Sequence, residues 1–251
     1  MPHIDLNCDL GESFGAYTIG MDEKVIPFIT SANVACGFHA GDPLVMQRTV
    51  ALCKQSGVAV GAHPGFPDLQ GFGRRQMKLT PAEAKACVQY QIGALKAFCD
   101  AAGVPLHHVK PHGALYNMAG KDRALADAIC AAVKESAPGA VLLALSGSEM
   151  VKAAQAIGLP VANEVFADRG YRPDGSLVPR GTPGAMIEDE DEAIARVIRM
   201  VTEGKVTAND GTDIAIQADS VCVHGDGPKA LAFVEKIGAA LQAAGVELKA
   251  F

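Results

Sequence analysis

The chain has 251 residues, a formal net charge of −6, 49% hydrophobic residues and 20% charged residues. This composition is typical of a globular domain and argues against a disordered chain. A nucleic-acid-binding surface is not expected, because the longest basic run is Arg74–Arg75. A membrane segment is not expected either, because no apolar run reaches the roughly 18 residues of a spanning helix.

Cysteine use and the first residues of the chain favour a reducing compartment. The 7 cysteines show no CxxC spacing, and the N-terminal stretch lacks the charged and apolar regions of a secretory signal. We therefore expect a cytoplasmic protein whose thiols are small buried hydrophobic groups.

Short apolar runs alternate with longer amphipathic runs along the whole chain. The strongest helix begins with Thr80 as N-cap, Pro81 at its first position and Glu83 to complete a capping box, and it ends at Gly103. Strands are predicted at residues 3–9, 31–37, 58–63, 106–112, 140–146, 160–167 and 220–225. Further helices are predicted at residues 22–28, 43–55, 122–135, 148–157, 188–201 and 228–244.

The strict alternation of strands and helices predicts a parallel sheet, because parallel neighbours need a crossover connection. About seven such units fit either an open doubly wound sheet or a closed barrel. Neither a dinucleotide-binding fingerprint nor a Walker A loop occurs in the chain, which favours the barrel. We therefore predict a single α/β domain over residues 1–251, built as a roughly seven-stranded parallel β/α barrel.

Three segments depart from this alternation. Residues 64–79 and 168–186 are long, rich in glycine and proline, and follow predicted strands, so we expect functional loops that cover a site. Residues 205–218 carry an Asp-Gly pair between two strand-like arms, which predicts a small hairpin outside the main sheet.

Polar side chains fall on one parity of the predicted strands, beginning with HIDLNCDLGE at residues 3–12. In a barrel, one parity of each strand faces the helices and the other faces the interior. Charged groups and imidazoles rarely line a core unless they are paired or chemically active, so we interpret the interior as the site. The residues on this parity are Asp5, Asn7, Asp9, Asn33, His63, His108, Lys110, His112, Glu164 and His224.

Three residues are candidates for catalysis, namely Asp9, Lys110 and His112. They lie at or just past predicted strand ends, where β/α barrels carry their catalytic groups. Lys110 and His112 share one face of an extended segment about 7 Å apart, so one substrate molecule can contact both. The alternative for Asp9 is a cap of the following turn, and for the other two a buried structural role.

Candidates for substrate binding line the predicted interior or lie in the loops at its mouth. Arginines of the long loops suit bidentate recognition of a carboxylate or phosphate. Asp9, His39 and His63 are the candidate ligands for a metal ion, although no local motif such as HExxH is present. The candidates for substrate binding are Asn7, Glu12, Asn33, His39, His63, Arg74, Glu164, Arg169, Arg180 and His224.

Eight segments together resemble the LamB/YcsF family, whose members are assigned as the A subunit of bacterial 5-oxoprolinase. The resemblance spans nearly the whole chain. The segments are DLNCDLGE, ANVACGFHAGDP, GAHPGFPD, GFGRR, VKPHGALYN, EVFADRGY, LVPRG and CVHGD.

This resemblance implies a β/α barrel similar to those of carbohydrate deacetylases and glycoside hydrolases. It also implies the ATP-dependent opening of 5-oxo-L-proline to L-glutamate, with ATP and Mg²⁺ as cofactors and two other 5-oxoprolinase subunits as partners. We expect activity to need magnesium because ATP does, and we expect no tightly bound transition metal.

In such a reaction Asp9 or His112 is the general base for water, Lys110 stabilises developing negative charge, and a loop arginine holds the substrate carboxylate. Removing Lys110 or His112 is then expected to lower turnover and to change thermal stability little. Two alternatives stay open. One is a metal-dependent deacetylase-like hydrolase of a carbohydrate amide, with Asp9, His39 and His63 holding the cation. The other is a noncatalytic subunit that binds a small carboxylate ligand.

Overall fold

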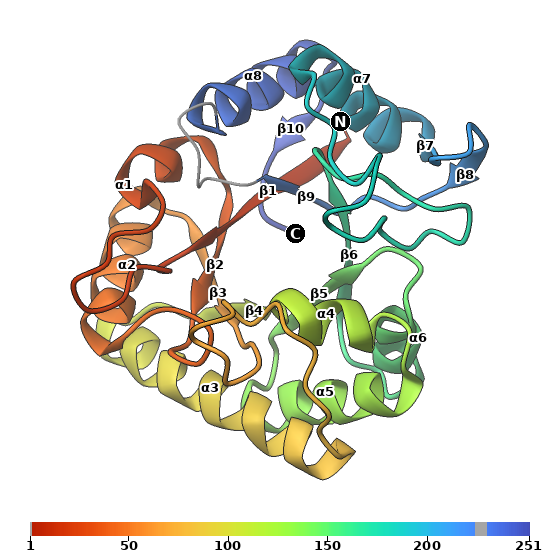
Figure 1. Cartoon of the computed structure of the whole chain (residues 1–251). Helices are drawn as coiled ribbons and strands as arrows, with labels where there is room; N and C mark the ends of the chain where they lie inside the picture. The colour runs from red at the N-terminus through yellow and green to blue at the C-terminus, as the bar shows by residue number, and fades with distance from the viewer. Residues whose placement is uncertain (1, 224–229) are drawn as a thin grey trace.

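The computed structural model describes residues 2–223 and 230–251. Seven parallel strands form a closed barrel, because β9 pairs with β6 on one side and with β1 on the other (Figure 1). This arrangement confirms the predicted parallel β/α barrel. In sheet order the strands are β1 His3–Leu10, β2 Ser31–Ala35, β3 Ala59–His63, β4 Leu106–Val109, β5 Val141–Leu145, β6 Val161–Phe166 and β9 Ser220–Val223.

Helices surround the barrel and connect successive strands, as parallel neighbours require (Figure 1). Within the described residues, no helix is long and apolar enough to cross a membrane. The helices are α1 Asp22–Val25, the 3-10 helix η1 Ile26–Phe28, α2 Pro43–Ser56, α3 Pro81–Ala102, α4 Gly113–Ala119, α5 Arg123–Ser136, α6 Glu149–Ala156, α7 Glu190–Glu203 and α8 Ala230–Ala243.

Helix α3 shows how local sequence defines the ends of a helix. Thr80 Oγ1 accepts a hydrogen bond from the Glu83 backbone N–H, and the Glu83 carboxylate accepts one from the Thr80 backbone N–H. Pro81 occupies the first turn, and Gly103 follows the last turn with a φ of 67°. These features confirm the predicted capping box and explain the terminal glycine, because a left-handed cap favours a residue without Cβ.

Two short elements were not predicted. Strand β10, Glu247–Leu248, pairs in parallel with His3 and Ile4 at the start of β1. Helix α4, Gly113–Ala119, follows β4 and has only 7 residues. Both are too short for a periodic pattern of apolar residues to reveal them.

Strand β4 ends at Val109, before the predicted end at His112. The chain nevertheless stays bonded to its neighbour beyond this point. The Lys110 backbone N–H donates to Ala62 O and the His112 backbone N–H donates to Pro64 O, both at 2.9 Å. The backbone of the two candidate catalytic residues is therefore held by the end of β3 and the residue after it.

The segment between β6 and β9 contains a second, separate sheet. Strands β7, Lys205–Thr207, and β8, Asp213–Ala215, pair antiparallel in the region where a hairpin is predicted. Residues 224–229, which include the candidate His224, lie outside the described residues.

The two faces of β1 have different surroundings, as the alternation of residue types predicts. Ile4, Leu6, Cys8 and Leu10 are at most 2% exposed and belong to the apolar core of the protein. The opposite face points into the barrel. There the Asp5 carboxylate accepts hydrogen bonds from hydroxyl groups that β2, β9 and the residue before β2 supply, namely those of Ser31, Ser220 and Thr30.

Asn33 extends this network toward the C-terminal ends of the strands. Its Nδ2 donates to Asn7 Oδ1 at 2.8 Å and to Asp9 Oδ1 at 2.9 Å, and its Oδ1 lies 2.8 Å from His108 Nε2. Gly61 on β3 leaves room for the His108 ring, because a Cβ at this position would collide with it. The part of the barrel interior beside β1 and β2 is therefore filled by paired polar groups.

Gly61→Ala should destabilise the protein by about 1–3 kcal/mol, the usual cost of forcing extra volume into a packed core. The matched control is Gly93→Ala, because a Cβ at Gly93 in helix α3 would meet nothing within 4 Å. The control should leave stability unchanged or raise it by about 0.4–1 kcal/mol. Urea unfolding of both variants measures the difference, and equal stabilities would contradict the role of Gly61.

Candidate active site

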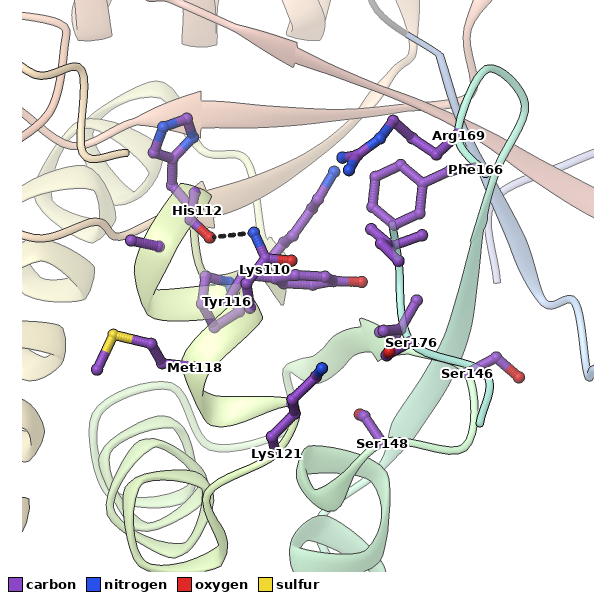
Figure 2. A pocket seen from close by; sticks show the side chains of 18 of the residues that line it. Lys110, His112, Tyr116, Met118, Lys121, Ser146, Ser148, Phe166, Arg169 and Ser176 are labelled. Carbon is purple, nitrogen blue, oxygen red and sulfur yellow. Dashed lines mark hydrogen bonds between the residues drawn. The ribbon is translucent and has the colours of Figure 1, made fainter. Parts of the chain in front are cut away.

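A cavity of about 1620 Å³ opens at the C-terminal ends of the barrel strands. Lys110, Tyr116, Phe166 and Arg169 point into it, as Figure 2 shows. Residues of both long loops, 64–79 and 168–186, contribute to its walls. Its volume exceeds the roughly 300–1,000 Å³ of a typical small-molecule pocket. The cavity is therefore large enough for a small substrate together with a second molecule.

Lys110 forms ion pairs with two carboxylates at the base of this cavity. Its Nζ lies 3.0 Å from Asp9 Oδ1 and 2.7 Å from Glu164 Oε1. Nζ also lies 3.2 Å from both Asn7 Oδ1 and Cys222 Sγ, and the side chain is only 4% exposed. An ammonium group has three N–H donors, and these partners are sufficient to use all of them. In this arrangement Lys110 positions the carboxylates around it.

Burial opposes a charge on Lys110 and on Asp9, but nearby groups of opposite charge outweigh it. Burial alone would lower the pKa of Lys110, whereas Asp9 and Glu164 hold that pKa well above its usual value. Burial alone would raise the pKa of Asp9, whereas His63 and Lys110 hold it well below its usual value. Asp9 is therefore a carboxylate at neutral pH and a weak proton acceptor.

Glu164 on β6 is completely buried and has a second partner besides Lys110. Its Oε2 accepts a hydrogen bond from the Tyr116 hydroxyl at 2.5 Å. Burial and the neighbouring Glu164 raise the pKa of Tyr116 well above its usual value. The Tyr116 ring also packs against Phe166, with 6.0 Å between ring centroids. Tyr116 and Phe166 were not candidates from the sequence, and the only indication was their place in the segments VKPHGALYN and EVFADRGY.

Three imidazoles meet beside Asp9, and we call His39, His63 and His112 the imidazole cluster. His39 stacks on His112 with ring centroids 3.7 Å apart and an interplanar angle of 3°, and His63 meets both rings edge-on. All three residues are at most 4% exposed. Two carboxylates border the cluster, with Glu12 Oε1 at 3.7 Å from His39 Nε2 and Asp9 Oδ2 at 3.2 Å from His63 Nε2.

Backbone carbonyls define which ring nitrogens of two of these histidines carry a proton. His63 Nδ1 lies 2.7 Å from Lys110 O, and His112 Nε2 lies 2.8 Å from Phe72 O. A carbonyl oxygen only accepts, so both of these nitrogens are N–H donors. Burial lowers the pKa of His112 to about 3, so its ring is neutral near pH 7. His63 Nε2 and His112 Nδ1 then face each other at 3.0 Å.

The loop after β3 brings the Phe72 carbonyl to His112 through an unusual backbone conformation. Phe72 has a φ of 53°, in the left-handed region that a bulky residue rarely adopts. The Asp68 carboxylate holds this turn, because it accepts hydrogen bonds from the Gly71 N–H at 3.0 Å and from Arg75 Nε at 2.9 Å. Strained residues of this kind persist where the surroundings determine their conformation, often at functional sites.

The side chains beside Asp9 are also suited to hold a metal ion. Ligand atoms of Glu12, His39, His63 and His112 lie within 4.8 Å of one another. His39 and His63 were candidate metal ligands from the sequence, and the third candidate, Asp9, borders this group. The expectation that no transition metal binds tightly therefore has no support from the arrangement of these residues.

The three candidate arginines differ in what they contact. Arg169 is 5% exposed and donates to Ala185 O at 3.1 Å and to Val178 O at 2.7 Å, so it holds the loop of residues 168–186 in place. Arg74 and Arg180 are exposed and line the cavity from the two different loops. Of the three, Arg74 and Arg180 are better placed to meet an anionic ligand at the mouth.

The remaining candidates fall into two groups. Asn7 and Asn33 are completely buried inside the barrel and bond to the groups beneath the cavity, so they support its base. Glu12 and His63 line the cavity together with the three candidate catalytic residues. His224 lies outside the described residues.

The closed parallel β/α barrel carries ionised groups and imidazoles at the C-terminal ends of its strands. These features place the protein in the class of barrels that carry their active sites at this end. The fold is similar to that of a family 4 carbohydrate esterase from Streptomyces lividans, with a TM-score of 0.52 at 12% identity, over 98% of this chain and 91% of that chain. This likeness concerns the fold alone. Within the class, the chain belongs to the LamB/YcsF family, whose model matches residues 4–251.

Several relatives are similar over their full length, which confirms the resemblance noted in the sequence. The A subunit of 5-oxoprolinase from Clostridium beijerinckii is 64% identical over 248 residues, covering 99% of this chain and 97% of the relative. The corresponding protein of Bacillus subtilis, which has the same name, is 58% identical over 250 residues, covering 100% and 97%. The crystal structure of the lactam utilization protein from Thermus thermophilus has a TM-score of 0.94 at 52% identity, covering 99% and 100%.

Lys110→Met should destabilise the protein by about 3–5 kcal/mol, because it leaves the buried Glu164 and the half-buried Asp9 without their counter-charge. This differs from the small effect expected from the sequence alone, which did not include the pairing with both carboxylates. Adding Glu164→Gln to this variant should recover part of the loss, since the amide removes one stranded charge. Urea unfolding of the single and double variants measures both effects. A single variant as stable as the wild type would contradict the assigned ion pairs.

Asp68 should contribute to stability in a pH-dependent way. Arg75 and the nearby backbone N–H groups lower the pKa of Asp68 to about 2, below its value of about 4 in an unfolded chain. The stabilisation is therefore present above pH 4 and is lost as the pH falls toward 2. The Tm of Asp68→Asn should lie below that of the wild type at pH 7, and the two should converge in acid. A constant difference between pH 7 and pH 2 would show that the charge is not responsible.

Proposed function

We propose that this chain is the A subunit of an ATP-dependent 5-oxoprolinase, which opens 5-oxo-L-proline to L-glutamate. The observation that carries the proposal is full-length similarity to proteins named as the A subunit of 5-oxoprolinase, at 64% identity for the relative from Clostridium beijerinckii. The similarity to a lactam utilization protein from Thermus thermophilus agrees with a cyclic amide as substrate.

The chemistry of the substrate explains why ATP is needed. A five-membered lactam is an unreactive amide, and transfer of the ATP γ-phosphoryl group to its oxygen releases ADP and activates the ring carbon. Water adds to this carbon and gives up a proton, the C–N bond breaks, and the amine takes a proton. A second water then hydrolyses the resulting acyl phosphate to glutamate and phosphate. ATP with Mg²⁺ supplies the phosphoryl group in this scheme.

The charges around the cavity suit a small anionic substrate. The carboxylate of 5-oxoproline is a ligand for the guanidinium groups of Arg74 and Arg180, which line the cavity from two loops. Asp9 and the imidazole cluster lie deeper, where attacking water is to be activated. Lys110 acts as a positioning residue that fixes Asp9 and Glu164. The size of the cavity, about 1620 Å³, agrees with a substrate and a phosphoryl donor bound together.

The proposal includes two other 5-oxoprolinase subunits as partners, because the relatives are named as one subunit of a larger enzyme. The sequence contains no phosphate-binding loop of the Walker type. This fits an arrangement in which partner subunits contribute to nucleotide binding. We also propose that residues 1–251 form a single domain.

Reconstitution tests the function. This chain is mixed with its two partner subunits, 5-oxoproline and Mg-ATP, and both glutamate and ADP are measured. We expect equal amounts of the two products, and neither product when this chain is omitted. Acetate release from an N-acetylated sugar without ATP would instead favour the deacetylase-like alternative. Full turnover without this chain would contradict the proposal.

His112→Ala should lower turnover in the reconstituted enzyme by about two to four orders of magnitude, the usual effect of losing a group that activates water. His107→Gln is the matched control, because His107 bonds to Phe251 O at 2.9 Å and does not line the cavity. The control should keep the wild-type rate. The Tm of both variants is measured in parallel. A His112→Ala enzyme that melts earlier but keeps its turnover would assign His112 a structural role only.

A further inference from the structure

We infer that Glu12 and the imidazole cluster form a binding site for a divalent transition-metal ion of the zinc type. The four ligand atoms lie within 4.8 Å of one another. The inference rests on the positions of these side chains and does not depend on the proposed function. Its test therefore measures metal, and not the formation of glutamate.

The first argument is the isolation of His39. Its side chain is completely buried, and neither ring nitrogen has a hydrogen-bond partner among the described residues. Buried polar groups are nearly always bonded, and an exception needs an explanation such as an ion. The nearest carboxylate oxygen, Glu12 Oε1, lies 3.7 Å from His39 Nε2. A cation beside the Glu12 carboxylate gives the His39 ring the partner that it lacks among the described residues.

The second argument is the direction of the two other imidazoles. His63 Nδ1 and His112 Nε2 donate to backbone carbonyls, which leaves His63 Nε2 and His112 Nδ1 as the nitrogens that face each other at 3.0 Å. The Asp9 carboxylate oxygen Oδ2 lies 3.2 Å from His63 Nε2. The lone pairs of His63 Nε2, His112 Nδ1 and Asp9 Oδ2 repel one another at these distances unless positive charge lies between them. Metal-binding histidines characteristically donate their other N–H to a carbonyl or carboxylate in this way.

The kind of donor atom defines the class of ion. Three imidazole nitrogens and one carboxylate oxygen match the ligands of Zn²⁺ and neighbouring first-row transition metals. Mg²⁺ and Ca²⁺ prefer oxygen ligands and suit this set poorly. The ligands of this site therefore differ from those that would bind the Mg²⁺ accompanying ATP.

Binding requires a small rearrangement that the surroundings permit. Bonds of about 2.0–2.1 Å to a tetrahedral zinc ion bring donor atoms to within roughly 3.4 Å of one another, closer than the 4.8 Å limit of this group. The parallel rings of His39 and His112 must tilt apart, and no hydrogen bond from the described part of the chain restrains the His39 ring. Gly65 and Gly73 leave space beside His39 because they have no side chain. A Cβ at either residue would approach His39 to 2.7 Å.

The competing explanation is a proton in place of the ion. Protonation of His63 on both nitrogens also places positive charge between His112 and Asp9. This explanation leaves His39 without a partner, and it predicts no stoichiometric metal. Metal analysis of the wild-type protein separates the two explanations.

The experiment uses the full chain without a histidine tag. The protein is dialysed against a chelator, loaded with Zn²⁺, separated from free metal by gel filtration, and analysed for zinc; Co²⁺ loading is followed by visible absorption. We expect one equivalent of zinc and the intense visible bands of Co²⁺ bound to nitrogen in a low-coordinate site. A wild-type protein with far less than one equivalent, or with only the weak bands of hydrated Co²⁺, would overturn the inference.

Variants show whether the bound metal lies at this site. Glu12→Gln and His39→Asn should each weaken zinc affinity at least about tenfold, measured by competition with a chelating dye. His107→Gln removes a histidine away from the cluster and should bind zinc as the wild type does. Glu12→Gln is the variant expected to keep its fold, because the Glu12 side chain lies at the rim with 12% exposed, and its Tm checks this. Wild-type affinity in both ligand variants would assign the zinc to another site and contradict the inference.

Discussion

The contact of Lys110 with Asp9 and Glu164 is the interaction on which the base of the cavity depends. It joins β1 and β6 across the barrel through a residue that follows β4, so that distant parts of the sequence meet at one ammonium group. Burying one such charge alone is costly, and the arrangement is stable only when all partners are present. The backbone carbonyl of Lys110 also holds His63. One residue therefore orients both the carboxylates and part of the imidazole cluster.

The polar groups below Lys110 explain how the barrel tolerates this charge. Asn7 and Asn33 connect Asp9 to the hydroxyl groups around Asp5, and each amide has partners on more than one strand. A fully bonded network in a low-dielectric interior is rigid, because a shift of one member leaves another without a partner. The polar residues inside the barrel therefore make the base of the cavity rigid. Any change of shape on ligand binding is then expected in the loops at the mouth of the cavity.

The alternation of strands and helices favoured a parallel barrel, and the alternation of polar and apolar residues then predicted the face of β1 that lies inside it. The parity rule depends only on strand geometry, which is local. Pairings between strands could not be predicted in the same way. That Lys110 would meet Glu164, and that Tyr116 would bond to the same carboxylate, depends on the closure of the barrel and on the short helix α4. Neither feature leaves a periodic pattern in the sequence.

The sequence identified the three histidines of the imidazole cluster as candidates but did not predict how their rings are arranged. His39 and His63 were candidates from the sequence for substrate binding and as metal ligands. Their relation to His112 depends on the Phe72 carbonyl, and hence on a backbone conformation that no propensity predicts for phenylalanine. The Asp68 turn holds that conformation from outside the cavity. Orientation of the cluster is therefore a property of the loop as much as of the strands, and a change in this loop alters the site without touching the barrel.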